Sequence, residues 1–331
     1  MESFTDQPSL EEETNFDTYE IDTQIFKNGE FIQVSKGKPD QIKNKFKLLK
    51  GLSQEELKKK DLNSDFPKYF SFITTKNFKY TGILSNNLKR ENYGYSLMEN
   101  DDEFLGEYKS EIRDGFGIYK FHSNEDEQDI YIGEYKNNKK AGKGLYLKIN
   151  KSIKDELTNE LILINYNCAM GEFEDDTFKK GKIFSVINDN ETLYKGKVNE
   201  IGLPSDENAL IVDGLDKIFI GKLIKGEMIE GRNIFVNEKW EKTKAYYFSK
   251  NNNKDNSYNF DYNKNEEKDN EVIKMAKVNS MKNYKNIIQK IFKNMNDDFE
   301  NFQNFDNAEK INFENEIKNK MKSDINKIIE E

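Results

Sequence analysis

The sequence predicts a mainly β protein, an elongated antiparallel meander of stacked hairpins with an α-helical C-terminal segment. Three observations support this prediction. Two adjacent stretches share one spacing of aromatic residues and glycines, 16 of the 19 glycines lie between Gly82 and Gly231, and the residues after 270 change to a helical period. Repeats at a fixed spacing indicate an array in which each unit packs chiefly on its neighbours.

The two strong copies begin with an aromatic-x-Gly-Glu-aromatic run and end with a Gly-x-Gly-x-Tyr run. Both runs alternate at period two, as half-buried strands do, and the polar residues between them predict a turn. Each copy therefore predicts one β-hairpin. The structural positions are Phe104, Gly106, Tyr108, Gly115, Gly117 and Tyr119 in the first copy, and Tyr131, Gly133, Tyr135, Gly142, Gly144 and Tyr146 in the second.

Glycine inside a strand weakens the strand unless the free space is used. We therefore expect backbone to approach closely at these glycines, or aromatic rings to lie over the bare backbone. The same rings would form the core of an ordinary β-sandwich or barrel, which is the alternative to the repeat interpretation.

This pattern resembles the MORN repeat family, whose unit is similar to Tyr-x-Gly-x-aromatic-x-x-Gly-x-x-x-Gly-x-Gly followed by a second aromatic strand. Both strong copies lack the mid-turn glycine and have Glu111 and Lys139 near that position. Weaker copies bring the total to about six units. They contribute the structural positions Tyr80, Gly82, Gly94, Gly171, Phe173, Gly181, Tyr194, Gly196, Phe219, Gly221 and Gly231.

The rest of the chain divides by composition. Residues 1–23 predict an acidic disordered arm, and residues 24–76 predict a small mixed α/β lead-in with a hairpin around Asn28-Gly29 and a helix from about Ser53. We expect the repeat sheet over 77–240, with Trp240 packing the end of its last hairpin. Residues 241–270 predict a solvated Asn- and Lys-rich linker, and residues 271–331 the C-terminal helices.

The C-terminal segment carries an apolar stripe with steps of three and four residues, which is typical of one helix face. Its Phe and Met residues, unlike the aliphatic seam of a coiled coil, favour docking into a partner's groove or onto the repeats. An exposed single helix is the simpler alternative. Because so apolar a stripe is costly in water, we expect it to bind a partner through Met281, Tyr284, Ile288, Ile291, Met295, Phe299 and Phe302.

Charge and hydropathy argue against several kinds of partner. The net charge is −9, the pI is about 5.1 and the mean hydropathy is −0.94, whereas nucleic-acid binding needs a clustered positive field. No apolar run is long enough to span a bilayer, which argues against a membrane partner. Acidic residues fill the stretch before Lys27, which argues against a secretory signal or transit peptide. The single cysteine, Cys168, agrees with the cytosol.

Catalytic candidates are few. His122, the single histidine, lies in a polar segment between repeats and is expected at the surface, and Cys168 lies on a repeat strand and is expected to be buried. The Gly-x-Gly pairs are not phosphate loops, because no Gly-Lys-Ser/Thr follows. We therefore expect no enzyme activity, cofactor, metal site or small-molecule substrate.

These features favour a structural or adaptor subunit. The MORN resemblance implies other proteins of a large cytoskeletal complex as partners. Richness in Asn, Lys and Ile resembles proteins of AT-rich genomes such as those of ciliates, where MORN proteins are common in the axoneme and in radial-spoke heads. The same resemblance also implies an alternative, a phosphoinositide tether of the cortical cytoskeleton, and Lys136, Lys139, Lys140 and Lys143 form one basic turn cluster for it.

Overall fold

The computed structural model describes residues 20–27, 30–37, 69–74, 79–84, 89–122, 127–154, 161–188, 190–214, 216–250, 258–261, 266–278, 281–304 and 323. Within them lie strands and helices with the following bounds: β1 (Glu20–Lys27), β2 (Glu30–Gly37), β3 (Tyr69–Thr74), β4 (Lys79–Leu84), β5 (Arg90–Leu97), β6 (Glu103–Lys109), β7 (Ile112–Phe121), β8 (Gln128–Lys136), β9 (Lys139–Lys154), β10 (Leu161–Glu174), β11 (Thr177–Ile187), β12 (Asn190–Lys197), β13 (Asp206–Asp213), β14 (Lys217–Ile224), β15 (Glu227–Val236), β16 (Lys242–Lys250), β17 (Tyr258–Asp261), α3 (Glu266–Val278) and α4 (Met281–Asn304).

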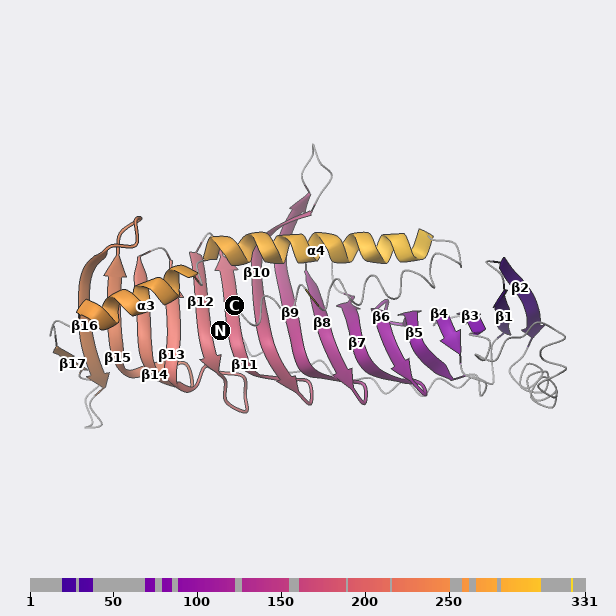
Figure 1. Cartoon of the computed structure of the whole chain (residues 1–331), viewed down its shortest axis with the longest axis horizontal. Coiled ribbons are helices and arrows are strands. Elements are labelled where there is room, and N and C mark those ends of the chain that lie inside the picture. The colour runs from indigo at the N-terminus through magenta and orange to yellow at the C-terminus, as the bar shows by residue number, and fades with distance from the viewer. Residues whose placement is uncertain are drawn as a thin grey trace.

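The described strands form one 17-stranded antiparallel sheet. From β3 to β17 each strand pairs with the next one in sequence, while β1 pairs with both β2 and β3. The result is the elongated meander that the sequence predicts, open at β2 and β17 (Figure 1). Because each strand contacts chiefly its sequence neighbours, the fold is built from local contacts.

A row of glycines crosses the sheet from β4 to β12. Each glycine is the register partner of the glycine on the next strand, so the row fixes one alignment of all nine strands. Its members are Gly82, Gly94, Gly106, Gly117, Gly133, Gly144, Gly171, Gly181 and Gly196. Ala209 takes the place of the next glycine on β13 and pairs with Gly221, which pairs with Gly231.

Four hairpins close with two-residue turns in which both central residues have positive φ, as in type I′ turns. The central φ values are 52° and 67° at Asn137 and Asn138, and 50° and 86° at Ser110 and Glu111. The pairs Asp175-Asp176 and Lys225-Gly226 repeat this conformation. In the two strong units the register slips after the turn, where Gly115 and Gly142 have φ values of 125° and 54°. The first glycine of each Gly-x-Gly therefore serves a β-bulge and the second belongs to the row.

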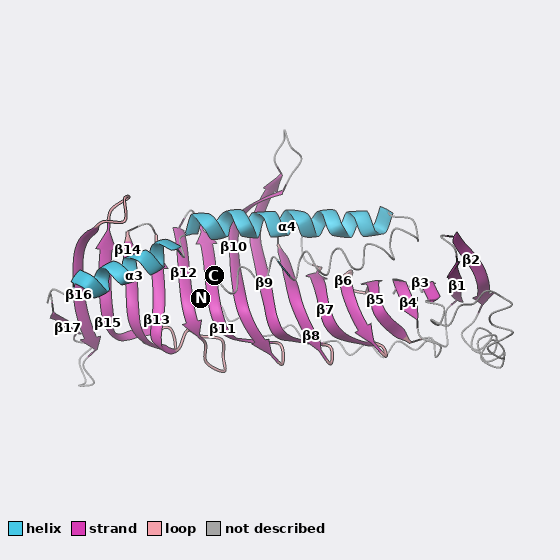
Figure 2. Ribbon diagram, in the orientation of Figure 1, coloured by secondary structure: helices cyan, strands magenta, loops and turns pink. Residues whose placement is uncertain are grey.

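Both helices lie across the strands on one side of the sheet (Figures 1 and 2). The helix α4 contacts β10 and β12, and α3 contacts β14 and β16. The hairpin of β9 and β10 is longer than its neighbours and projects beyond α4 (Figure 1).

The structure corrects the predicted segments at both ends of the repeat sheet. The sheet begins before residue 77, because it includes β1, which starts at Glu20 inside the predicted acidic arm, and β2 and β3 of the predicted lead-in. The stretch 241–270 is not a linker throughout, because it contains β16, β17 and the start of α3. Its lysines and asparagines alternate with residues such as Phe248, which is buried, so the composition concealed a strand period. The predicted hairpin around Asn28-Gly29 is present as β1 and β2, with Lys27 paired to Glu30. The acidic arm up to residue 19 and the helix expected near Ser53 lie outside the described residues.

Candidate functional site

Aromatic rings form a continuous chain along the face of the sheet opposite the helices. Successive rings meet edge to face, with centroids 5.1 to 5.8 Å apart, which is the favourable arrangement for aromatic pairs. The chain runs from β4 to β11 through Tyr80, Tyr108, Phe104, Tyr135, Tyr131, Phe173 and Phe178. We call these rings and the residues packed with them the aromatic face.

The glycine row supplies the floor of the aromatic face. A Cβ atom added at Gly144 would lie 2.7 Å from carbon atoms of the Tyr131 ring, and one at Gly117 would lie 2.6 Å from the Phe104 ring. The rings therefore occupy the volume that any side chain would need. This confirms the expectation that rings lie over bare backbone, and Tyr80 and Phe219 repeat the arrangement at the ends of the array.

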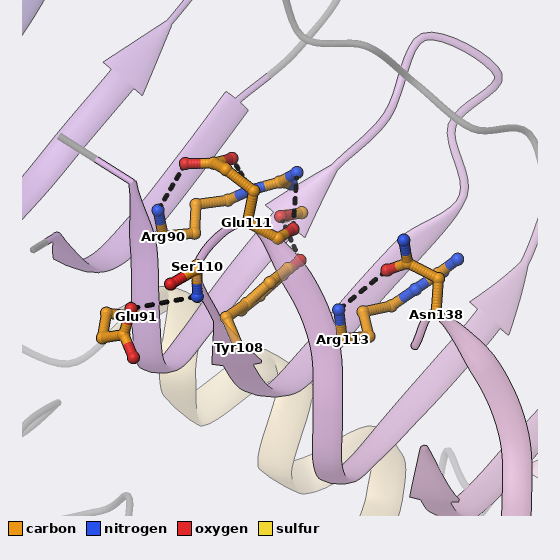
Figure 3. Close-up of polar contacts among 8 residues, drawn as sticks. Arg90, Glu91, Tyr108, Ser110, Glu111, Arg113 and Asn138 are labelled. Carbon is orange, nitrogen blue, oxygen red and sulfur yellow. Dashed lines mark hydrogen bonds and ion pairs between the residues drawn. The ribbon is translucent and has the colours of Figure 1, made fainter. Parts of the chain in front are cut away.

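Each strong hairpin turn is tied to the strand before it by a two-way hydrogen-bonded contact, which we call the turn clamp. The Glu111 N–H donates to the Arg90 carbonyl at 3.0 Å, and the Arg90 N–H donates to Glu111 Oε1 at 2.6 Å. One unit later, the Asn138 N–H donates to the Arg113 carbonyl at 3.0 Å, and the Arg113 N–H donates to Asn138 Oδ1 at 2.7 Å. Figure 3 shows both clamps side by side.

A third clamp follows the same rule at the next unit. The Asp176 N–H donates to the Lys140 carbonyl at 3.1 Å, and the Lys140 N–H donates to Asp176 Oδ1 at 2.8 Å. Farther along, the Gly226 N–H donates to the Pro204 carbonyl at 2.7 Å. The second hydrogen bond of the other clamps is missing there, because Gly226 has no side-chain acceptor and Pro204 has no N–H to donate.

The basic residue of each of the three two-way clamps, Arg90, Arg113 or Lys140, lies over the aromatic face. The Arg90 guanidinium lies 4.8 Å from the Tyr108 ring centroid and bonds Glu111 Oε2 through Nε at 2.9 Å. Arg113 lies over three rings, and Lys140 Nζ lies 4.8 Å from the centroid of Tyr146. Such cation–π contacts are stronger when partly desolvated.

Two carboxylates complete the aromatic face at equivalent places, 27 residues apart. The Tyr119 hydroxyl donates to Asp102 Oδ2 at 2.8 Å, and the Tyr146 hydroxyl donates to Asp129 Oδ2 at 2.5 Å. Burial raises the pKa of Asp129, and the Tyr146 hydrogen bond opposes that rise. Asp102 is buried and Asp129 is partly buried, and both carboxylates are hydrogen-bonded, as buried polar groups must be for stability.

The opposite face of the sheet is covered by the helices. Tyr284, Ile288, Ile291 and Met295 are buried in one core with residues of the sheet, joined by Phe292 and by Ile273 and Ala276 of α3. The apolar stripe was expected to dock either into a partner's groove or onto the repeats. The structure shows that these four residues dock onto the repeats of the same chain. The side chains of Met281, Phe299 and Phe302 lie outside the described residues.

Polar contacts fix the helices in place. Lys182 Nζ donates to the Tyr284 hydroxyl at 2.7 Å, and the Leu163 N–H donates to Gln289 Oε1 at 3.1 Å. On α3, the buried carboxylate of Asp269 forms ion pairs with Arg232 and Lys242. Burial alone would raise the pKa of Asp269, but the hydrogen bonds and charges of Arg232 and Lys242 hold it below its usual range.

The residues weighed for catalysis have structural surroundings. The His122 backbone N–H donates to Asp102 Oδ1 at 2.6 Å. Cys168 is buried, and burial raises the pKa of its thiol. Trp240 packs partly buried against the helix-side core.

In the described part of the chain, no three His, Cys, Asp or Glu side chains converge to hold a metal ion, and no helix has the length and apolar character needed to cross a membrane.

The predicted basic turn cluster is exposed only in part. Lys140 is buried over the aromatic face, while Lys139 is exposed and lies 3.4 Å from Asp175. Lys136 is also exposed and is the register partner of Lys139 across the turn, and Lys143 lies within β9. Because Lys140 is buried, the four lysines do not all contribute to one exposed basic surface.

Comparison with known proteins adds no assignment. No family model matches the chain, and no curated protein matches it.

The turn clamps were missed by sequence reasoning, although a signal existed: Arg113 and Lys140 are 27 residues apart, as are Phe104 and Tyr131. A basic residue that recurs with the repeat could have been recognised as part of the unit.

Proposed function

We propose that this chain is a non-enzymatic structural or adaptor subunit that holds partner proteins in a large cytoskeletal assembly. The observation that carries the proposal is the repeated unit itself, in which ring over glycine and turn clamp recur from hairpin to hairpin. Such an array gives a long body of fixed shape with a large surface for its volume, which suits the separation and alignment of partners.

The surroundings of the catalytic candidates also support a binding role. Cys168 is buried in the packing of the sheet, and the carboxylates of Asp102 and Asp129 on the aromatic face are bonded to tyrosine hydroxyls. Side chains that are satisfied in this way hold a structure together and are poorly placed to move protons for a substrate.

The proposed place of action is the cytoplasmic cytoskeleton, and within it the ciliary axoneme, for example in a complex like the radial spoke. This part of the proposal rests on the MORN resemblance and on the composition of the chain.

Co-sedimentation tests the proposal. Purified full-length chain is mixed with detergent-extracted axonemes and, separately, with phosphatidylcholine vesicles that contain phosphatidylinositol bisphosphate. We expect saturable pelleting with axonemes and weak pelleting with vesicles. A chain that stays in the supernatant with axonemes contradicts the proposal, and salt-sensitive sub-micromolar vesicle binding would replace the adaptor role with a membrane tether.

A further inference from the structure

The three turn clamps that have hydrogen bonds in both directions differ in the charge of their turn residue. Arg90 is matched by the carboxylate of Glu111 and Lys140 by that of Asp176, whereas Arg113 is matched by the neutral amide of Asn138. The amide keeps the hydrogen bond to the Arg113 N–H but supplies no negative charge. Of the three turn residues, the one that faces Arg113 is therefore the only one that brings no negative charge.

The surroundings of Arg113 sharpen this contrast. Its guanidinium carbon lies 4.9 Å from the Tyr119 ring centroid and 5.6 Å from those of Phe104 and Tyr135. The described residues provide no carboxylate in an ion pair with it, whereas the Arg90 guanidinium bonds Glu111 directly. Arg113 is also partly exposed, while Arg90 and Lys140 are buried. It is a preorganised cation within reach of a partner.

We propose that Arg113 is the anchor for an aspartate or glutamate side chain on an acidic segment of a partner protein. The Arg90 clamp supplies the template, because there the chain itself places the Glu111 carboxylate on the guanidinium. A planar guanidinium held over aromatic rings offers two parallel N–H donors, which match a carboxylate and form a stronger bond than neutral groups do. This site rests on the proposed adaptor function and names the chemistry of its ligand.

A carboxylate fits better than a lipid phosphate. The site is one cation set between two hairpin turns, and of the lysines near the next turn Lys140 is buried over Tyr146 and Lys139 pairs with Asp175. Binding to a membrane surface gains about 1 kcal/mol per basic residue and therefore needs several on one surface. A single half-buried arginine instead suits a side chain that projects from a peptide.

A peptide array probes the site with the full-length chain. Peptides containing Asp and Glu are compared with the same peptides carrying Asn and Gln. The variants are Arg113→Gln, which removes the cation, and Asn138→Glu, which gives Arg113 the partner that Arg90 has. The control is Lys109→Gln, an exposed lysine at the adjacent turn. Thermal melts show that each variant is folded.

We expect the parent chain and Lys109→Gln to prefer the acidic peptides. Arg113→Gln should lose roughly 10- to 100-fold in affinity for them, as the loss of a hydrogen bond to a charged group predicts. Asn138→Glu should lose the same preference while melting no lower than the parent, because its own carboxylate occupies the site. A structural role for Arg113 would not give this separation of binding from stability.

The proposal is overturned if the parent shows no preference for acidic peptides, or if the preference persists in both variants. It is also overturned if phosphatidylinositol bisphosphate vesicles bind in an Arg113-dependent way while the peptides do not, because the ligand is then a lipid. Axoneme pelleting that survives Arg113→Gln rejects this site and leaves the adaptor function standing, so the two failures are distinguishable.

Discussion

The two faces of the sheet are stabilised in different ways. On the aromatic face, Phe104 and Tyr131 lie over glycines of their own units, and Phe104 meets Tyr135 of the next unit, so the packing involves only neighbouring repeats. On the other face, aliphatic side chains of β10 and β12 are covered by α4, a segment that begins 84 residues after the end of β12. One face is closed by local contacts and the other by a distant helix.

The two faces therefore contribute differently to the fold: the aromatic face determines the geometry of the hairpins, and the helices shield the opposite face from water. The ring-over-glycine packing and the turn clamps set the register and twist of the array, whereas the helices exclude water from the remaining face. Variants on the helix should therefore cost burial and leave hairpin geometry intact. Variants in the glycine row should disturb the hairpins themselves.

The largest effect is expected at the helix. Ile288 is 1 % exposed and packs against the sheet, so Ile288→Ala should lower the free energy of unfolding by about 3 kcal/mol, through lost burial and a cavity. Urea denaturation followed by circular dichroism measures this loss. Lys290→Ala, at an exposed position of the same helix, should change little. Equal effects of the two variants would show that α4 does not rest on the sheet in solution.

In the glycine row, Gly144→Val should cost about 2 to 3 kcal/mol, because its side chain overlaps the Tyr131 ring. Lys139→Ala is the matched control, since its ion pair with Asp175 is exposed on both sides and is worth little. Thermal melts of both variants decide the matter. If Gly144→Val melts with the parent, the rings are not fixed over the glycines.

The same contrast explains what the sequence could predict. The aromatic face was predictable because Phe104, Gly106 and Gly117 lie within one unit, and their spacing alone implies ring over glycine. The packing of α4 on the opposite face was only partly predictable. The period through Tyr284, Ile288, Ile291 and Met295 predicted the helix, but no local sequence signal indicates on which surface its apolar stripe packs. Arg113 escaped notice because its role depends on comparing one clamp with its neighbours, and β16 escaped because its lysines suggested solvent.

The third prediction concerns the ion pairs that attach α3. Asp269→Asn should cost about 2 kcal/mol at neutral pH, since it leaves Arg232 and Lys242 without their counter-charge in a partly buried place. Because the pKa of Asp269 is held low in the folded chain, its contribution is full above the unfolded pKa of about 4. It is lost as pH falls through the lower folded pKa.

Melting temperatures measured from pH 7 down to pH 3 check this prediction. The gap between parent and Asp269→Asn should be constant near neutral pH and should close in the acid range. Glu191→Gln, which removes the more exposed pair with Lys285, serves as the control and should show almost no gap. A gap that is constant over the whole range would mean that the carboxylate charge of Asp269 is not what attaches α3.

The smallest effect compares two turn clamps, one complete and one reduced. Asn138→Gly keeps a residue that tolerates the φ of 67° but removes the acceptor of the Arg113 N–H, so about 1 kcal/mol of stability should be lost. Gly226→Asn should change stability by only a few tenths of a kcal/mol, because Pro204 has no N–H for the new acceptor to receive. Chemical denaturation of the two variants resolves this difference. If Gly226→Asn stabilises the chain as much as Asn138→Gly destabilises it, the side-chain acceptor is acting on its own turn, and the contact between hairpins is not what makes the clamp stable.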